Sequence, residues 1–67
     1  MEEYKVEINH AVNAGEFDIY LQKYEDGVLV DADNFIKTYK SEHWAVKFAE
    51  KLADEYEGEV VRTEVAD

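Results

Sequence analysis

The hydrophobic period of the chain changes at Ser41. Before it, hydrophobic and polar residues alternate in short runs, which is the pattern of strands with one buried side. From Ser41 to Tyr56 hydrophobic residues recur at helical spacing, and alternation returns in residues 59–65, EVVRTEV. The pattern predicts one α+β domain, residues 1–67, with the element order β-β-β-α-β. We expect an antiparallel sheet of roughly three to four strands plus a C-terminal strand, with the helix packed on one face.

The first two strands are predicted from clean alternation in residues 4–10, YKVEINH, and 17–24, FDIYLQKY. HAVNAG, ending at Gly15, connects them. EDG at 25–27 is a hairpin signal, because Gly27 can take the positive φ of a tight turn. The residues of these strands predicted to face the core are Tyr4, Val6, Ile8, Phe17, Ile19 and Leu21.

The third run, VLVDADNFIKTYK, predicts an extended segment interrupted at DADN by a bulge or a short turn. Its residues 28–40 are compatible with one bent strand or with two short ones. The residues predicted to point inward are Val28, Val30 and Ala32, and those predicted to point outward are Leu29, Asp31 and Asp33.

Ser41 is predicted to cap the helix, with Glu42 near the positive end of the helix dipole. Gly58 is predicted to be the left-handed residue after the helix. The helix residues expected to form its core face are Trp44, Phe48, Leu52 and Tyr56, flanked by Ala45, Ala49 and Ala53. The last strand is predicted to turn Val61, Thr63 and Val65 inward.

The chain is strongly acidic, with 17 acids against 7 bases and a net charge of −10. Repulsion of this kind argues against direct binding to nucleic acid or to an anionic membrane, since both are polyanions. The start, MEEYKVEI, does not have the pattern of a signal peptide, and no apolar run approaches the ~20 residues that cross a bilayer. We therefore expect a cytoplasmic protein.

Sites for metals or catalysis are not indicated. DADNF with Glu42 partly matches a calcium loop, but Phe35 and Ile36 stand where that loop needs an oxygen ligand and a glycine. The two histidines, His10 and His43, are predicted to be ordinary surface residues and are a poor basis for a zinc site. No cysteine, nucleophile motif or phosphate loop is present. We expect no cofactor, no metal, no catalytic residues and no enzymatic activity.

The acids are unevenly placed. Residues 1–36 have a net charge of −7, residues 37–52 of +2, and residues 53–67 of −5. One row of strand acids, spaced ~6.6 Å apart, has about half the charge density of one DNA strand with its phosphate every ~3.4 Å. Tyr20 and Tyr24 fall among outward acids and are equally compatible with packing and with partner contact. The predicted partner-binding residues are Glu16, Asp18, Tyr20, Tyr24, Glu25, Asp26, Asp31, Asp33, Glu57, Glu59 and Glu64.

With these carboxylates across its hairpin and tail, the chain resembles small acidic DNA mimics encoded by phages. It is most similar to the compact inhibitors of bacterial histone-like (HU) nucleoid proteins. The resemblance implies a homodimer that occupies the basic DNA-binding surface of a nucleoid-associated or other DNA-binding protein, in the host cytoplasm if the protein is viral. It also implies that the lysines around the helix face away from the target.

Two other interpretations remain open. FIKTYKSEHWAVKFAEKLADEYEGEVV also resembles uncharacterised bacterial ββαβ modules, in which case the chain is a protein-interaction module with a merely solvated acidic surface. Halophilic adaptation is the third, although six lysines and large aromatic residues fit it poorly. An exposed edge at the first or last strand would permit a continuous sheet across a two-fold axis.

Overall fold

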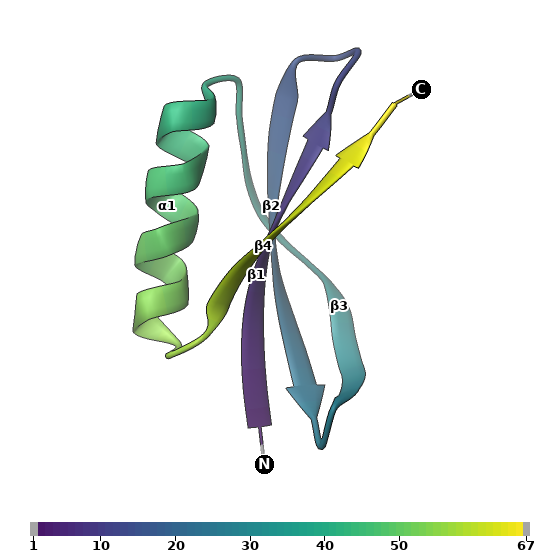
Figure 1. Ribbon diagram of the computed structural model, residues 1–67, viewed down its shortest axis with the longest axis vertical. Helices are drawn as coiled ribbons and strands as arrows, with labels where there is room; N and C mark the ends of the chain where they lie inside the picture. The colour runs from purple at the N-terminus through teal and green to yellow at the C-terminus, as the bar shows by residue number, and fades with distance from the viewer. Residues whose placement is uncertain (1, 67) are drawn as a thin grey trace.

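The computed structural model describes residues 2–66, and within that range it does not describe the side chains of residues 32 and 33. Figure 1 shows one helix lying along one face of a twisted sheet. The elements are β1 (Glu2–Ala11), β2 (Glu16–Glu25), β3 (Val28–Tyr39), α1 (Glu42–Glu55) and β4 (Glu59–Val65). The predicted α+β class and the order β-β-β-α-β are confirmed.

The sheet has the strand order β3-β2-β1-β4. β1 pairs antiparallel with β2, and β2 antiparallel with β3, but β4 pairs parallel with β1. The sheet is therefore mixed rather than antiparallel throughout, because α1 carries the chain back to the end where β1 begins. β1, the first strand in sequence, lies inside the sheet. The two edge strands of the sheet are β3 and β4.

The β2–β3 hairpin closes through Asp26 and Gly27, between the paired residues Glu25 and Val28. Both turn residues have positive φ, 51° and 81°, which is the signature of a type I′ turn. The hairpin predicted from EDG is confirmed.

β3 is one strand, but it carries extra residues that β2 does not match. Register shifts occur where Ile19 pairs with Lys37 and Tyr20 with Phe35, and twice more toward the hairpin turn. The strand bends away from α1 near that turn (Figure 1). Val28 pairs with Glu25 and therefore lies on the helix side, as predicted. Val28 and Val30 are nevertheless not buried but 63% and 50% exposed, since the helix does not cover this end.

The same bulges change which side of the sheet Asp31 occupies. Asp31 pairs with Lys23, and Leu29 pairs with the next β2 residue, Tyr24, so Val30 is an inserted residue. Lys23 continues the buried row of β2, and Asp31 therefore lies on the helix side, not outward as predicted. The predicted placements of Ala32 and Asp33 lie outside the described side chains.

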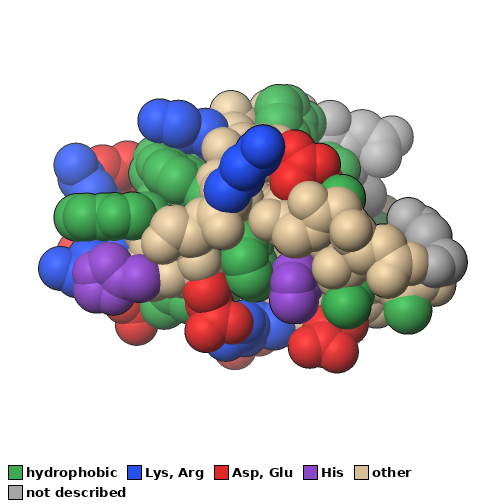
Figure 2. All heavy atoms as spheres, turned by 90° about the horizontal axis from the view of Figure 1, so that it is seen from above, with side chains coloured by type: hydrophobic (Ala, Val, Ile, Leu, Met, Phe, Trp, Pro, Cys, Tyr) green, Lys and Arg blue, Asp and Glu red, His purple; other side chains and the backbone are tan. Residues whose placement is uncertain are grey.

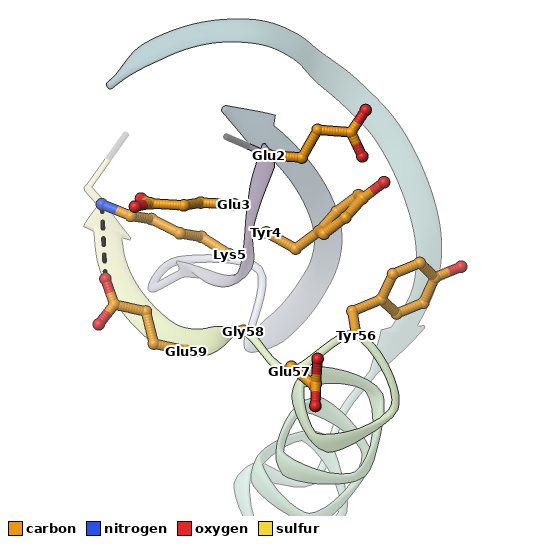
Figure 3. Close-up of a pocket in the computed structure, with 8 residues that line it drawn as sticks. All are labelled: Glu2, Glu3, Tyr4, Lys5, Tyr56, Glu57, Gly58 and Glu59. Atoms are coloured by element: carbon orange, nitrogen blue, oxygen red, sulfur yellow. Dashed lines mark ion pairs between the residues drawn. The ribbon is translucent and has the colours of Figure 1, made fainter. Parts of the chain in front are cut away.

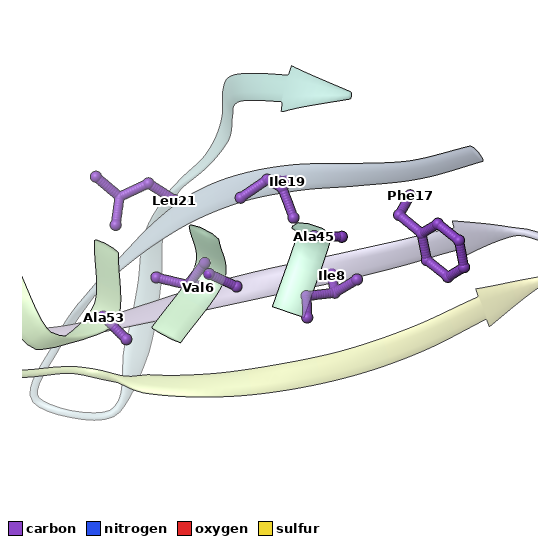
Figure 4. Packing of buried hydrophobic residues seen from close by; sticks show 8 residues of the cluster. Val6, Ile8, Phe17, Ile19, Leu21, Ala45 and Ala53 are labelled. Atoms are coloured by element: carbon purple, nitrogen blue, oxygen red, sulfur yellow. The ribbon is translucent and has the colours of Figure 1, made fainter. Parts of the chain in front are cut away.

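The core lies between α1 and the two middle strands (Figure 4). Its buried residues are Val6, Ile8, Phe17, Ile19, Leu21, Ala45, Ala49 and Ala53. The inward faces predicted for β1 and β2 are confirmed, with Tyr4 half-buried at the margin.

The helix buries Ala45, Ala49 and Ala53, which flank the predicted face, more deeply than the large residues expected at its centre. Trp44 is 58% exposed and Tyr56 42% exposed, while Phe48 and Leu52 are only half-buried. Ala45, Ala49 and Ala53, called the alanine stripe below, let the helix backbone approach the sheet closely because their side chains are small. The large residues of α1 therefore lie at the margins of the contact between helix and sheet.

Both ends of α1 are capped by hydrogen bonds. The Ser41 hydroxyl oxygen accepts a hydrogen bond from the Trp44 N–H at 3.4 Å, which confirms the N-cap. At the other end the Gly58 N–H donates to the Ala53 carbonyl at 2.8 Å and the Glu57 N–H to the Asp54 carbonyl at 3.3 Å, the Schellman pattern.

The left-handed residue of this motif is Glu57, with φ 53°, and not Gly58 as predicted. Gly58 is required for a different reason. A Cβ at this position would collide with the backbone carbonyl of Tyr4, where β4 begins beside β1.

β4 turns the opposite side to the core from the one predicted. Val60 packs against the core and Arg62 reaches Glu42 of the helix, while Thr63 donates to Glu7 on the other face. The parallel register pairs Val60 with the buried Val6, and paired residues share a face.

Candidate partner-binding site

The sheet face opposite α1, called the helix-free face below, holds several of the predicted partner-binding residues. Glu16, Asp18, Tyr20 and Tyr24 alternate along β2 with the buried residues. The Asp18 carboxylate accepts a hydrogen bond from the Thr38 hydroxyl at 2.6 Å. The Tyr20 ring meets Phe35 edge-on at 5.7 Å, and the Lys5 ammonium lies 4.7 Å from the centre of the Tyr24 ring. Both tyrosines thus pack within the sheet and keep part of their surface exposed.

Glu7 also lies on the helix-free face, and it was not among the predicted residues. Its carboxylate accepts hydrogen bonds from the Thr63 hydroxyl at 2.7 Å and from the Gln22 amide at 3.4 Å. Its outward position in the alternating run of residues 4–10 would have allowed Glu7 to be predicted on this face.

A second group of acids gathers at one end of the molecule. In Figure 1 the start of β1, the β2–β3 turn and the end of α1 all lie at the lower end. The register places Glu2 opposite Glu25 and Lys5 opposite Glu59. We call this region the acidic end, and its acids are Glu2, Glu3, Glu25, Asp26, Glu57 and Glu59.

The acidic end contains an open groove of about 600 Å³, drawn in Figure 3. Glu2, Tyr4 and Tyr56 lie to one side of β1 in this view, and Glu3, Lys5 and Glu59 to the other. The Tyr4 and Tyr56 rings are 5.0 Å apart, and Lys5 Nζ lies 3.4 Å from Glu59 Oε1. Carboxylates around two tyrosine rings suit a cationic side chain such as arginine.

Two lysines compensate part of this charge. Lys23 Nζ lies 3.2 Å from the Glu2 carboxylate and 3.8 Å from that of Glu25. The hydrogen bond and the charge of Glu2 raise the pKa of Lys23 above its ordinary value of 10.5, so this lysine remains a cation. Among the described residues Glu3 and Glu57 have no ion-pair partner, which leaves the acidic end with a net negative charge.

The helix terminus adds to the negative potential of this end. The last turn of α1 contains no basic residue, although cations are the residues that stabilise a helix C-terminus. Asp54 and Glu55 stand there instead, next to Glu57. The acids at this terminus therefore act against helix stability.

The opposite end of the molecule is of mixed charge. Figure 2, which looks onto the end where α1 begins, shows basic side chains interspersed with acidic ones. Lys37 lies 5.0 Å from the Tyr39 ring centre and Lys47 lies 6.0 Å from that of Trp44. Charge is thus segregated along the long dimension of the molecule, which measures 36 Å.

Not all predicted residues come together. Glu25, Asp26, Glu57 and Glu59 meet at the acidic end, whereas Glu16 and Asp18 lie on the helix-free face toward the other end. Glu64 lies 3.9 Å from His10, and Asp31 lies on the helix side. Glu2 and Glu3 were not among the predicted residues. The alternating run of residues 4–10 could have been extended toward the first residue, and pairing that longer strand with residues 16–25 would have placed Glu2 opposite Glu25.

His10 is not the ordinary surface residue that we expected. Its ring stacks on Phe17 with 4.2 Å between centroids, and it is half-buried. His43 is exposed, as expected. Within the described part of the chain, no three His, Asp or Glu side chains lie close enough together to hold a metal ion. No helix within residues 2–66 has the length and apolar character needed to cross a bilayer.

Comparisons with protein-family models, with curated proteins and with solved structures find no match to this chain.

Proposed function

We propose that this chain is an acidic DNA mimic, which binds the basic DNA-binding surface of a nucleoid-associated or other DNA-binding protein and blocks its access to DNA. The proposed contact is the acidic end, together with the adjoining part of the helix-free face. The proposed place of action is the cytoplasm, or the host cytoplasm if the protein is viral. No enzymatic activity and no direct contact with nucleic acid or membrane are part of the proposal.

The observation that carries the proposal is the position of the acids at the end of α1. Asp54, Glu55 and Glu57 stand where bases would stabilise the helix, each at a typical cost of about 0.3–1 kcal/mol. Acids that served only solubility could stand anywhere on the surface without this cost. Glu57 also lines the groove of the acidic end together with Glu2, Glu3 and Glu59. This supports a role in which concentrated negative charge is itself the useful property.

The spacing of the acids is also compatible with a DNA surrogate. Neighbouring strands lie about 4.8 Å apart, so the backbone positions of acids paired across strands, such as Glu2 and Glu25, are closer than those of successive outward acids along one strand. This lateral spacing approaches the ~3.4 Å of axis per phosphate of a DNA strand. The lysines near the start of α1 lie at the far end and would not face the basic partner.

The test is displacement of labelled duplex DNA from a purified basic nucleoid protein of the HU type. We expect the chain to compete with the DNA, and to do so less well as salt is raised, because ion pairs dominate both complexes. The double variant Glu3→Gln/Glu57→Gln should weaken competition roughly three- to tenfold. Its matched control is Glu16→Gln/Glu50→Gln, which removes two other acids without ion-pair partners among the described residues and reaches the same net charge of −8, from −10.

Equal weakening by both double variants would move the contact away from the acidic end. A failure of the wild-type chain to displace DNA at low salt, from HU or from other basic DNA-binding proteins, would rule the proposal out.

The second candidate is a protein-interaction module whose acids are only a solvated surface. It is favoured by the exposed hydrophobic residues of β3, namely Val28, Leu29, Val30, Phe35 and Ile36. Binding of this kind would depend on one or two of these apolar anchors and would tolerate neutralisation of the acids.

A further inference from the structure

The two edges of the sheet differ in how well they can accept another strand. β3 is interrupted by register shifts at three places, and bulges of this kind protect an edge from pairing. β4 instead pairs with β1 over all seven of its residues without a shift. Its other side faces no strand of the described sheet. β4 is therefore the edge that is regular enough to pair again.

The backbone groups on the free side of β4 can be assigned. The Val65 carbonyl accepts a hydrogen bond from the Val12 N–H at 3.0 Å, so Val65 directs its backbone groups toward β1. Backbone groups of successive strand residues point to alternate sides. Val60, Arg62 and Glu64 therefore present their N–H and C=O groups to the open edge.

A second copy of β4, related by a two-fold axis normal to the sheet, would pair antiparallel with these groups. The residues that hydrogen-bond across this pairing are the open ones, Val60, Arg62 and Glu64, in both copies. Their numbers are all even, so the midpoint of any such pair is a residue, and the two-fold axis must pass through a residue and not between two residues. With the axis at Thr63, Arg62 stands directly opposite the second copy's Glu64, and the symmetry creates this pair twice. On the helix-free face the same register sets Val61 opposite the second copy's Val65, also twice.

The neighbouring registers lack this match. An axis at Arg62 sets two arginines opposite each other, and an axis at Glu64 sets two glutamates opposite each other. Like charges directly opposite across strands are destabilising. An axis at Val61 leaves Arg62 opposite Val60. Only the register centred on Thr63 places opposite charges face to face.

The side chains that would make these contacts are available. Arg62 is 50% exposed and the Glu64 side chain 75% exposed. Arg62 already donates to the Glu42 carboxylate at 2.9 Å, but a guanidinium has five N–H donors and can serve a second carboxylate.

The helices leave room for such a pairing. α1 packs mainly over β1, and the two copies of β1 would stand three strand spacings apart, about 14 Å. A helix with its side chains is about 10–12 Å across. Two copies of α1 therefore fit side by side on one face of a continuous sheet.

We infer that the chain forms a symmetric homodimer through antiparallel pairing of β4 with β4 of a second copy, centred on Thr63 and specified by two Arg62–Glu64 pairs. The interface is short beside stable complexes that bury about 1,200–2,000 Å², so the dissociation constant is expected to be roughly micromolar. The inference does not depend on the proposed function, since its test involves no DNA-binding protein.

The experiment is sedimentation equilibrium from about 1 µM to about 1 mM protein at ~0.15 M salt, where charges far apart are screened. Wild type should pass from a mass of 7.8 kDa to twice that value. Arg62→Glu and Glu64→Arg should each raise the dissociation constant roughly tenfold or more, because each sets like charges opposite each other twice. The double variant Arg62→Glu/Glu64→Arg should restore dimerisation to within roughly threefold of wild type.

The net charges of the variants distinguish a specific effect at this interface from the general electrostatic repulsion between two acidic chains. Glu64→Arg changes the net charge from −10 to −8, so reduced repulsion alone would tighten any dimer, whereas opposed arginines weaken this one. Lys51→Glu on the exposed side of α1 is the control for Arg62→Glu, since both reach −12, and it should leave the dissociation constant within roughly threefold. Circular dichroism of every variant checks the fold.

Two results would overturn the inference. One is a wild-type chain that stays monomeric at about 1 mM protein. The other is a dimer that Glu64→Arg and Arg62→Glu affect no more than Lys51→Glu does, or that the double variant fails to restore, which would place the interface elsewhere.

Discussion

Two adjacent residues after α1, Glu57 and Gly58, show how closely the backbone is determined where the helix meets the sheet. Glu57 holds the left-handed conformation, and Gly58 passes against the Tyr4 carbonyl. The sequence indicated a helix end here, but it assigned the special conformation to the glycine, because glycine is the usual residue in that position. The close approach to Tyr4 joins residues distant in sequence, and no local pattern records it.

Gly58→Ala is expected to lower the free energy of unfolding by about 2–3 kcal/mol, because the added Cβ meets backbone that can move only by separating β4 from β1. Gly15→Ala is the control. Its Cβ would meet open space, and only the positive φ of 66° is unfavourable, at a cost of about 1 kcal/mol. Urea denaturation of both variants provides the comparison, and a smaller loss for Gly58→Ala than for Gly15→Ala would contradict this account.

At the scale of elements, types and boundaries were predictable from hydrophobic period and turn signals. The buried sides of β1 and β2 followed from alternation, whereas those of α1 and β4 did not. In α1 the alanine stripe lies next to the row of large hydrophobic residues. The larger residues were predicted to be the more deeply buried, but the alanines are. In β4 both Val60 and Val61 were candidates, and the parallel register with β1 decides between them.

The C-terminus of α1 offers a test at this scale. Glu57→Gly should stabilise the protein by about 0.5–1 kcal/mol, since glycine adopts the left-handed conformation without strain and the change removes a carboxylate from the negative end of the dipole. Glu55→Gly, inside the helix, also removes a carboxylate from the negative end of the dipole, but glycine costs about 0.5–1 kcal/mol there in helix propensity, so the net change in stability should be close to zero. Thermal unfolding followed by circular dichroism distinguishes them, and a loss of stability in Glu57→Gly would show that the strain at this φ is negligible.

For the molecule as a whole, charge is the dominant property. The sequence predicted segregation of acids and lysines along the chain, and the structure converts this into an acidic end and an end of mixed charge. The part that sequence could not supply is the meeting of Glu2, Glu3, Glu57 and Glu59, which depends on β4 lying beside β1. Nor could sequence show that bulges in β3, which depend on tertiary pairing, place Asp31 on the helix side opposite Lys23 instead of on the predicted outward side.

Stability of the whole molecule should depend on ionic strength. Raising the salt concentration from about 0.01 M to about 0.5 M shortens the Debye length from ~30 Å to less than ~8 Å and screens the repulsion within a chain of net charge −10. We expect the thermal midpoint to rise by about 5 °C, which for a domain of this size corresponds to about 1 kcal/mol. Calorimetry at low protein concentration measures it. An unchanged midpoint would mean that the acids are too far apart to repel, and complete unfolding at low salt would support halophilic adaptation.

The position of β1 between β2 and β4 has a consequence for how the chain acquires its structure. The Thr63–Glu7 hydrogen bond joins residues 56 positions apart, and contacts of such long range are typical of domains that fold in milliseconds to seconds. A nascent chain that has reached only Glu55 can already form the β1–β2–β3 meander and the helix, but β1 then has an open edge. β4 closes that edge last, and until it does, a strand that lies inside the finished sheet is exposed to pairing with a wrong partner.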